Sequence, residues 1–226
     1  MHPVSSPPVS ARASSAPSAP YIPEPGHISA VYASVLIPFQ ALFDKGRPGS
    51  QEAEYSSLGY SGRRSRPCVV VDAAPGEAVT IFLMTTWNGV PLRNLPFVYE
   101  HFSVVVNQTA DDDAAGVLHT TPRWHAEEKQ IQYVIPLSVI SDPPPHRRYM
   151  KGLVPYMVNT EQMLRAAFFQ DDLMRLWNDL RAKKPGFQER QEHNWLVCLN
   201  TNGTMQITAL LNGLRVEVYS MSSSML

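Results

Sequence analysis

Three arginines stand directly before a β-branched run in the stretch GRRSRPCVVVD, residues 62–72. Arg63, Arg64 and Arg66 lie between Glu54 and Asp72, a segment with no acidic side chain inside it, and Tyr60 precedes them closely. The planar guanidinium fork suits phosphate oxygens, and a tyrosine ring can stack on a nucleobase. The pattern indicates either a site for the phosphates of a nucleic acid or a solvated entrance to a strand.

Other patterns that would indicate an enzyme are incomplete in this sequence. It has neither a Gly-rich phosphate loop ending in Lys-Ser/Thr nor a G-x-G-x-x-G motif. Around Ser61, Arg63 stands where a nucleophile elbow needs its second glycine. His119 and His125 have no common zinc spacing, and the adjacent carboxylates at 111–113 do not follow a calcium-loop pattern. We therefore predict neither a metal nor a cofactor.

Composition indicates one ordinary globular domain. The 226 residues are 44% hydrophobic and 17% charged, which is enough to bury a substantial core. The net charge of −1 gives no global attraction to polyanions, so nucleic-acid binding would need a local patch.

Cysteine usage and hydropathy favour an intracellular protein. Cys68 and Cys198 each lie in an apolar run, and two distant cysteines do not make a disulfide framework. We expect both to be reduced core residues. No apolar stretch is long enough to span a bilayer and no secretory signal is visible, so we predict a cytoplasmic or nuclear protein without a membrane partner.

The elements that must position the arginines follow from periodicity and turn signals. The Pro, Ser and Ala-rich residues 1–25 predict a disordered tail, which leaves one domain over 26–226. β-branched and alternating runs predict strands, with a long polar loop over 44–66 and a turn at 75–76. The predicted strands cover residues 28–37, 68–71, 79–84, 102–106 and 130–140.

One long helix is predicted over residues 159–182. Asn159 or Thr160 can cap it, and Gln162 stands where a capping-box partner would. Its expected apolar face covers the protein's own sheet, the alternative being a partner interface. That face comprises Leu164, Phe168, Leu173, Leu176, Trp177 and Leu180.

The end of the chain predicts a β-meander. The runs WLVCL, TMQITALL and LRVEVYSM are separated by the turn signals NTNG and NG. The elements together predict a mainly β fold with one long helix, in which a small barrel or curled antiparallel sheet carries the helix on its surface.

The order of the motifs resembles the PemK/MazF-like toxin domains over residues 26–106. A glycine and an aromatic-containing strand (GHISAVY), an Arg-Pro before a hydrophobic strand (SRPCVVVD), a strand ending in a threonine pair (TIFLMTT) and the segment LPFVYEHFSVVV follow in the order of that family. The resemblance implies that the sheet is an SH3-like small β-barrel, on which the helix predicted above would pack. It also implies metal-independent cleavage of single-stranded RNA.

The same resemblance implies site residues. Arg66 would stabilise charge on the phosphorane, and Thr85 would position the phosphate or the attacking hydroxyl. From their residue types, and not from the resemblance, we expect Arg63, Arg64 and Tyr60 to bind the RNA beside them. We expect single-stranded RNA as the ligand, with a second copy or another protein as a further partner.

Two functions remain open at this stage. The Arg66 and Thr85 pair favours an endoribonuclease. Ser61, which stands where the family carries an acidic or amide residue, favours a non-catalytic SH3-like binding or interaction module.

Overall fold

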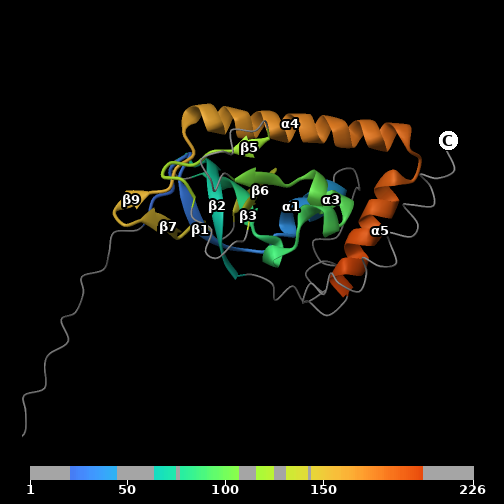
Figure 1. Cartoon of the computed structure of the whole chain (residues 1–226), viewed down its shortest axis with the longest axis horizontal. Coiled ribbons are helices and arrows are strands. Elements are labelled where there is room, and N and C mark those ends of the chain that lie inside the picture. Colours follow the sequence, from blue (N-terminus) through green and yellow to red (C-terminus); the bar gives the residue numbers. More distant parts are fainter. Residues whose placement is uncertain are drawn as a thin grey trace, which may run out of the picture.

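A curled half-barrel sheet of seven strands forms the centre of a mixed α/β fold (Figure 1). The computed structural model describes residues 21–44, 64–74, 77–106, 116–124, 131–141 and 144–200. The order across the sheet is β5-β4-β6-β3-β2-β1-β7. The strands are β1 Ile28–Ala33, β2 Arg64–Asp72, β3 Val79–Thr85, β4 Val104–Val106, β5 Val117–Leu118, β6 Tyr133–Ser141 and β7 Arg147–Arg148.

Helices lie on both sides of this sheet. In Figure 1, α4 runs along one side above β5, α5 descends from the end of α4, and α1 and α3 lie beside the central strands. Two short 3₁₀ helices, η1 and η2, follow β3. The helices are α1 Ile37–Asp44, η1 Trp87–Gly89, η2 Leu92–Asn94, α3 Phe97–His101, α4 Thr160–Lys183 and α5 Phe187–Asn200.

Both faces of the central strands are buried, which explains why they read as continuous apolar runs. Side chains alternate along a strand, so Cys68 and Val70 enter one core while Val69 enters another. The first core includes Leu83 of β3 and has Ile37 of α1 packed against it. The second core, which includes Val69, also contains Phe82, Met84, Trp124, Tyr156 and Ala166 of α4.

The predicted arginine and threonine lie near each other because strands β2 and β3 are paired. β1 pairs with β2 so that Val31 lies opposite Arg66, and β2 pairs with β3 so that Cys68 lies opposite Leu83. Arg66 lies two residues before this pair on β2, and Thr85 lies two residues after it on β3. The two side chains therefore come from neighbouring ends of adjacent strands.

The predicted long helix is confirmed as α4, and its start has the expected cap. The Asn159 side chain accepts a hydrogen bond from the Gln162 main-chain nitrogen at 2.9 Å. The capping box is not formed, because Gln162 Oε1 instead accepts from the His119 main-chain nitrogen at 3.1 Å. Gln162 thus ties the first turn of α4 to the chain that follows β5.

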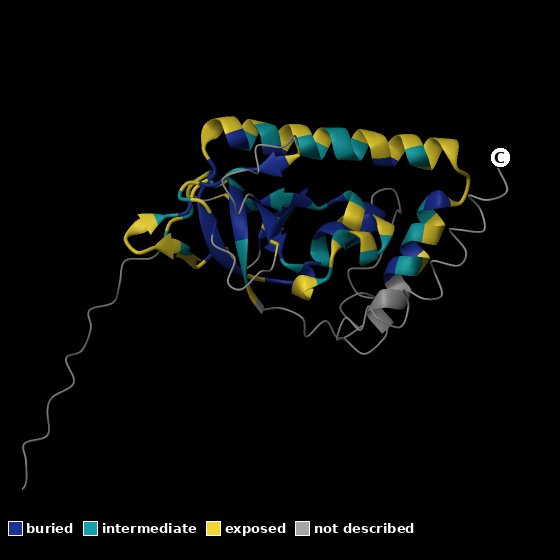
Figure 2. Cartoon of the chain, in the orientation of Figure 1, coloured by how far each residue is buried: buried dark blue, intermediate teal, exposed yellow. Residues whose placement is uncertain are grey.

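The single apolar face predicted for α4 is wrong. Leu164, Phe168 and Leu176 are exposed. Figure 2 shows exposed residues, in yellow, along the whole length of α4. The physical reason is that α4 contacts two cores along its length. Ala166 packs against the sheet, while Trp177 packs among the helices α1, α3 and α5.

Three predicted strands need correction. The strand at 28–37 ends at Ala33 and α1 follows, and the strand at 102–106 shortens to β4 behind α3. The first strand of the C-terminal meander, 195–199, lies within α5. The other two meander strands and residues 1–20 of the predicted tail lie outside the described residues.

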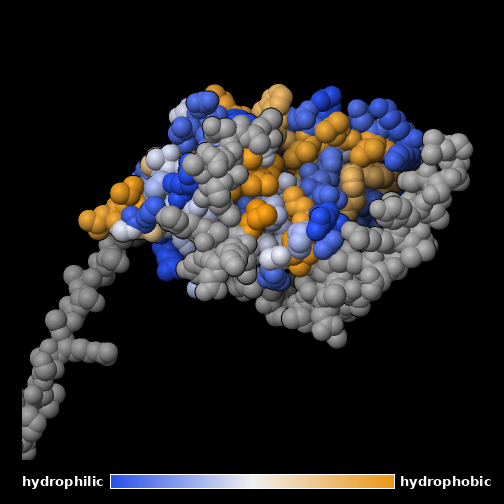
Figure 3. Space-filling view, in the orientation of Figure 1, coloured by the Kyte–Doolittle hydropathy of each residue, from blue (hydrophilic) through white to orange (hydrophobic). Residues whose placement is uncertain are grey.

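A small hairpin projects beside β7. It pairs β8, Met150–Lys151, with β9, Val154–Pro155. Leu153 at its turn is 94% exposed, and Figure 3 shows hydrophobic side chains at this end of the molecule. Within the described part of the chain, no helix is both long and apolar enough to cross a membrane.

Candidate functional site

A pocket of about 310 Å³ lies where β2 begins and β3 ends. Its lining offers one guanidinium, three hydroxyls and two amides, and it includes no carboxylate. The lining residues are Ser65, Arg66, Pro67, Met84, Thr85, Thr86, Asn88 and Gln132. A positive charge among neutral hydrogen-bonding groups suits an anion.

Arg66 is held across the end of β1. Its Nε donates a hydrogen bond to the Ala33 main-chain oxygen at 3.1 Å, and the side chain is half-buried. The sequence suggested a loop ending at this arginine, but β2 already begins at Arg64. Arg66 is therefore a strand residue whose guanidinium is oriented by the neighbouring strand.

Thr85 ends β3 and is 5% exposed. Its Oγ1 accepts a hydrogen bond from the Trp87 main-chain nitrogen at 3.0 Å. A hydroxyl that accepts one bond still carries a proton to donate. Thr85 can therefore fix the turn after β3 and donate to an oxygen atom in the pocket.

That turn has a strained backbone. Trp87 and Asn88 have φ values of 48° and 55°, and Gly89 follows with φ 78°. The left-handed conformation costs a residue with a Cβ about 1–2 kcal/mol. The turn is closed by a hydrogen bond from the Gly89 nitrogen to the Thr86 oxygen at 2.9 Å, and it places the exposed Asn88 at the pocket.

The buried indole of Trp87 holds this turn in place. Its Nε1 donates to Ser103 Oγ at 2.9 Å, and Ser103 Oγ donates to the Tyr99 oxygen at 2.6 Å. The ring centroid lies 4.8 Å from that of Tyr99 and 6.2 Å from that of Phe39. Packing in the core thus maintains a backbone conformation that serves the pocket.

Gln132 forms another wall of the pocket. It is 4% exposed, and its Nε2 donates to the Tyr133 main-chain oxygen at 3.3 Å. Tyr133 opens β6 and pairs with Thr85, so this amide comes from a distant part of the chain. Sequence reasoning missed both Gln132 and Asn88. The Asn-Gly dipeptide at 88–89 is a turn signal that could have indicated the second.

Several predicted site residues are not brought to the pocket. Tyr60, Ser61 and Arg63 lie outside the described residues. Arg64 begins β2, but its side chain is outside them too. The structure therefore brings together Arg66 and Thr85 from the predicted set.

Of the two histidines considered for zinc, His125 lies outside the described residues, and neither His119 nor a third histidine, His101, lines the pocket. His101 Nε2 donates to the Leu173 main-chain oxygen at 3.0 Å, and burial lowers the pKa of its imidazole. His119 contributes its main-chain nitrogen to Gln162. In the described ranges, no three His, Cys, Asp or Glu side chains gather as metal ligands would.

Cys68 is an unreactive thiol. It is fully buried, and its Sγ donates to the Ser29 main-chain oxygen at 3.3 Å. Burial raises its pKa to about 12, so the thiolate that acts as a nucleophile is not formed near neutral pH. The prediction of a buried core residue is confirmed for Cys68, while the side chain of Cys198 lies outside the described residues.

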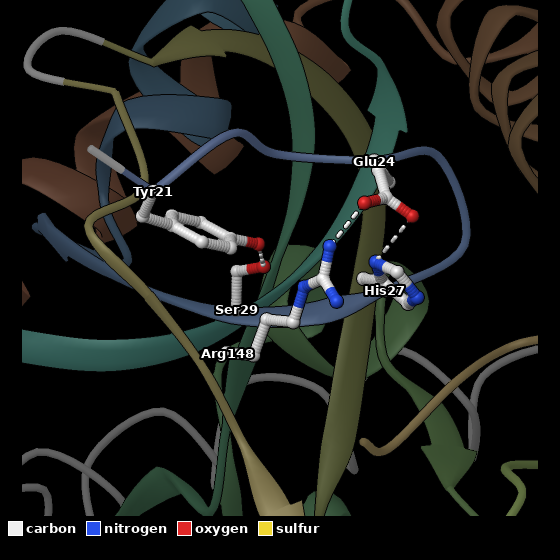
Figure 4. Close-up of polar contacts among 5 residues, drawn as sticks. All are labelled: Tyr21, Glu24, His27, Ser29 and Arg148. Carbon is white, nitrogen blue, oxygen red and sulfur yellow. Dashed lines mark hydrogen bonds and ion pairs between the residues drawn. The ribbon is translucent and has the colours of Figure 1, made fainter. Parts of the chain in front are cut away.

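A second polar cluster ties the segment before β1 to β7 (Figure 4). The Glu24 carboxylate pairs with Arg148, and His27 Nδ1 lies 3.5 Å from its other oxygen. The buried Ser29 Oγ shares a 2.6 Å hydrogen bond with Tyr21 Oη rather than with His27. The cluster therefore lacks a serine–histidine pair and serves to fasten chain segments.

Comparison with protein-family models, with curated proteins and with solved structures finds no match for this chain.

Proposed function

We propose that the pocket binds a phosphodiester group of single-stranded RNA, and that the chain is a metal-independent endoribonuclease with a PemK/MazF-like, SH3-like barrel. The observation that supports this is the meeting of Arg66 and Thr85 in one pocket without a carboxylate in its lining. The two residues were singled out by a sequence resemblance that contains no information on distance. Their shared pocket is therefore an independent argument.

The proposed reaction is a transesterification within the RNA. The 2′-oxygen attacks the adjacent phosphorus, the bond from phosphorus to the 5′-oxygen breaks, and a 2′,3′-cyclic phosphate and a 5′-hydroxyl form. The lining offers neither imidazole nor carboxylate. The 2′-hydroxyl proton therefore passes to water, and water returns a proton to the 5′-oxygen.

Two side chains would act on the charge that builds up at phosphorus. The Arg66 guanidinium faces the non-bridging oxygens, where a fixed cation stabilises the phosphorane more than the ground state. The Thr85 hydroxyl donates to one of the same oxygens. Asn88 and Gln132 supply amide groups, which both donate and accept, to the sugar or to a base edge.

A non-catalytic binding module is the second candidate. It is favoured by the absence of an imidazole or carboxylate from the lining residues, because proton transfer by a positioned side chain contributes about 10²–10⁴-fold to catalysis. Such a module would keep the phosphate contacts and bind RNA without cutting it.

The test compares cleavage of an unstructured RNA by wild type, Arg66→Ala and Arg175→Ala in buffer with EDTA. Arg175 is a matched control because it is an exposed arginine on α4. We expect Arg66→Ala to cleave RNA at least about 100-fold more slowly than wild type. Arg175→Ala should cleave at the wild-type rate. Formation of the cyclic phosphate end identifies the reaction.

Three results decide between the candidates. A wild type that binds RNA but leaves it intact supports the module and rejects the nuclease. Full activity in Arg66→Ala rejects the pocket as the active site. If wild type neither binds nor cleaves RNA, both candidates are wrong.

A further inference from the structure

An exposed pair of stacked rings lies beside the pocket. Tyr32 and His146 have ring centroids 4.8 Å apart and planes inclined by 14°. Tyr32 is 51% exposed and is the one exposed residue of β1, whose other five residues are buried. His146 is exposed as well. A flat aromatic pair open to solvent on an otherwise buried strand requires an explanation.

The position of Tyr32 follows from the strand register. It lies opposite Ser65, which lines the pocket, and opposed residues project to the same face. Arg66, the next residue of β2, projects to the other face, so the ring pair adjoins the pocket on the side of Ser65. The next residue, Ala33, supplies the oxygen that orients Arg66. The ring pair and the proposed phosphate site are thus neighbours on adjoining strands.

The main chain also fixes the partner ring. The His146 nitrogen donates to the Ala30 oxygen at 2.9 Å, immediately before β7 joins the edge of the sheet. Ala30 itself lies opposite Pro67 of the pocket on one side and Arg147 on the other. Arg147 is therefore about two strand spacings, roughly 10 Å, from the pocket wall.

The edge that carries His146 and Arg147 is positively charged. Residues 143–160 include His146, Arg147, Arg148 and Lys151 and no acidic side chain. Arg148 is matched by Glu24, whereas Arg147 is exposed and has its guanidinium carbon 5.9 Å from the centroid of the Tyr149 ring. Alternating rings and cations are the surface that single-stranded nucleic acids favour.

We propose that the Tyr32–His146 pair is a nucleobase platform, on which one base of the bound strand stacks while the adjoining phosphate occupies the Arg66 pocket. Arg147 then contacts a phosphate further along the strand. The inference rests on the proposed binding of RNA and extends it from a phosphate site to a path across β2, β1 and β7 (Figure 1). Every base has a π-face, so the platform binds bases with little sequence preference.

The experiment separates base stacking from phosphate binding. Fluorescence anisotropy measures the affinity of the full chain for a labelled 2′-O-methyl oligoribonucleotide, which transesterification cannot cleave. A second probe has the same backbone without bases. The variants are Tyr32→Ala, Tyr32→Phe, Arg66→Ala and, as a matched exposed aromatic on α4, Phe168→Ala.

We expect Tyr32→Ala to weaken binding of the base-containing probe by about tenfold and to leave the abasic probe unchanged. Tyr32→Phe keeps the ring and restores the affinity. Phe168→Ala leaves the affinity for both probes unchanged, and Arg66→Ala weakens the binding of both probes.

Other results overturn the platform. If Arg66→Ala weakens both probes while Tyr32→Ala weakens neither, the platform is wrong and the phosphate site stands. If Tyr32→Ala weakens both probes equally, its effect is not base stacking. If Tyr32→Ala leaves RNA binding intact but abolishes a dimer seen by sedimentation, the rings instead contact a second copy. If wild type binds neither probe, the RNA proposal fails together with the platform.

Discussion

Arg66 Nε donates to the Ala33 oxygen, so β1 sets the plane of the guanidinium that enters the pocket. Lysine carries its charge at one point on a flexible stem and cannot make this bond while presenting a planar fork. We expect Arg66→Lys to bind RNA about tenfold more weakly than wild type and more tightly than Arg66→Ala. Titration at fixed salt measures this. Equal affinity of Lys and Arg would show that charge alone suffices.

Thr85 links the pocket to the folded core. Removing its hydroxyl in Thr85→Val leaves the Trp87 main-chain nitrogen without its acceptor, and we expect a loss of about 1–3 kcal/mol in the free energy of unfolding. Thr85→Ser keeps the acceptor and most of the stability. Urea denaturation measures both variants. A valine variant as stable as wild type would contradict the proposed role of the hydrogen bond.

Asn88 allows stability and binding to be separated. Asn88→Ala places a residue with a Cβ and no local polar group at φ 55°, so we expect a loss of about 1 kcal/mol. Asn88→Gly fits the same conformation and should match wild type in thermal unfolding. Both variants lose the amide at the pocket and should bind RNA more weakly. A glycine variant with unchanged affinity would exclude Asn88 as a ligand contact.

The central strands and α4 were predictable because their signals are local. β-branched runs between turn residues indicated β2, β3 and β6, and Asn159 indicated the start of α4. The helices α1 and α5 were missed because apolar runs such as 195–199 carry no period that distinguishes a strand from a buried helix. Tertiary packing decides those cases.

The candidate site was predictable only in part, for a similar reason. Arg66 and Thr85 stand beside motifs of a resembling family, so the sequence could indicate them. Gln132 and Tyr32 reach the site through strand pairing between distant segments. Register of that kind leaves no mark in a single sequence.

Gly26 is a position where only glycine fits. Its φ is +83°, and an added Cβ would lie 2.6 Å from the Val158 main-chain oxygen. We expect Gly26→Ala to lower the free energy of unfolding by about 2–4 kcal/mol. Gly152→Ala is the control, with φ +63° and no atom within 4 Å of the new Cβ, and should cost about 1 kcal/mol. Equal losses would mean that the contact with Val158 relaxes.

Two histidines with lowered pKa values, the buried His27 and the half-buried His101, predict how stability changes at acidic pH. The pKa of His27 is lowered mainly by burial and further by the charge of Arg148, while Glu24 acts in the opposite direction. Burial also lowers the pKa of His101. Below the ordinary value of 6.5 the unfolded chain therefore binds protons that the folded chain does not. Stability should be independent of these groups above pH 6.5 and should fall as the pH drops below it.

Denaturant titrations between about pH 5 and pH 7.5, roughly the range in which histidines titrate, measure this dependence. His27→Gln removes one of the two groups and should flatten the slope, whatever its effect on absolute stability. A slope unchanged from wild type would show that His27 takes up its proton equally well in the folded state.

The two faces of β2 and β3 are covered by parts of the chain made at different times. Arg66 and Thr85 belong to consecutive strands, so their shared edge can form as soon as both leave the ribosome. The opposite face, with Val69, Phe82 and Met84, lacks the cover of α4 until synthesis has passed a further stretch of chain. A nascent chain therefore carries the pocket's two principal residues before α4 can cover the opposite face of the strands that hold them.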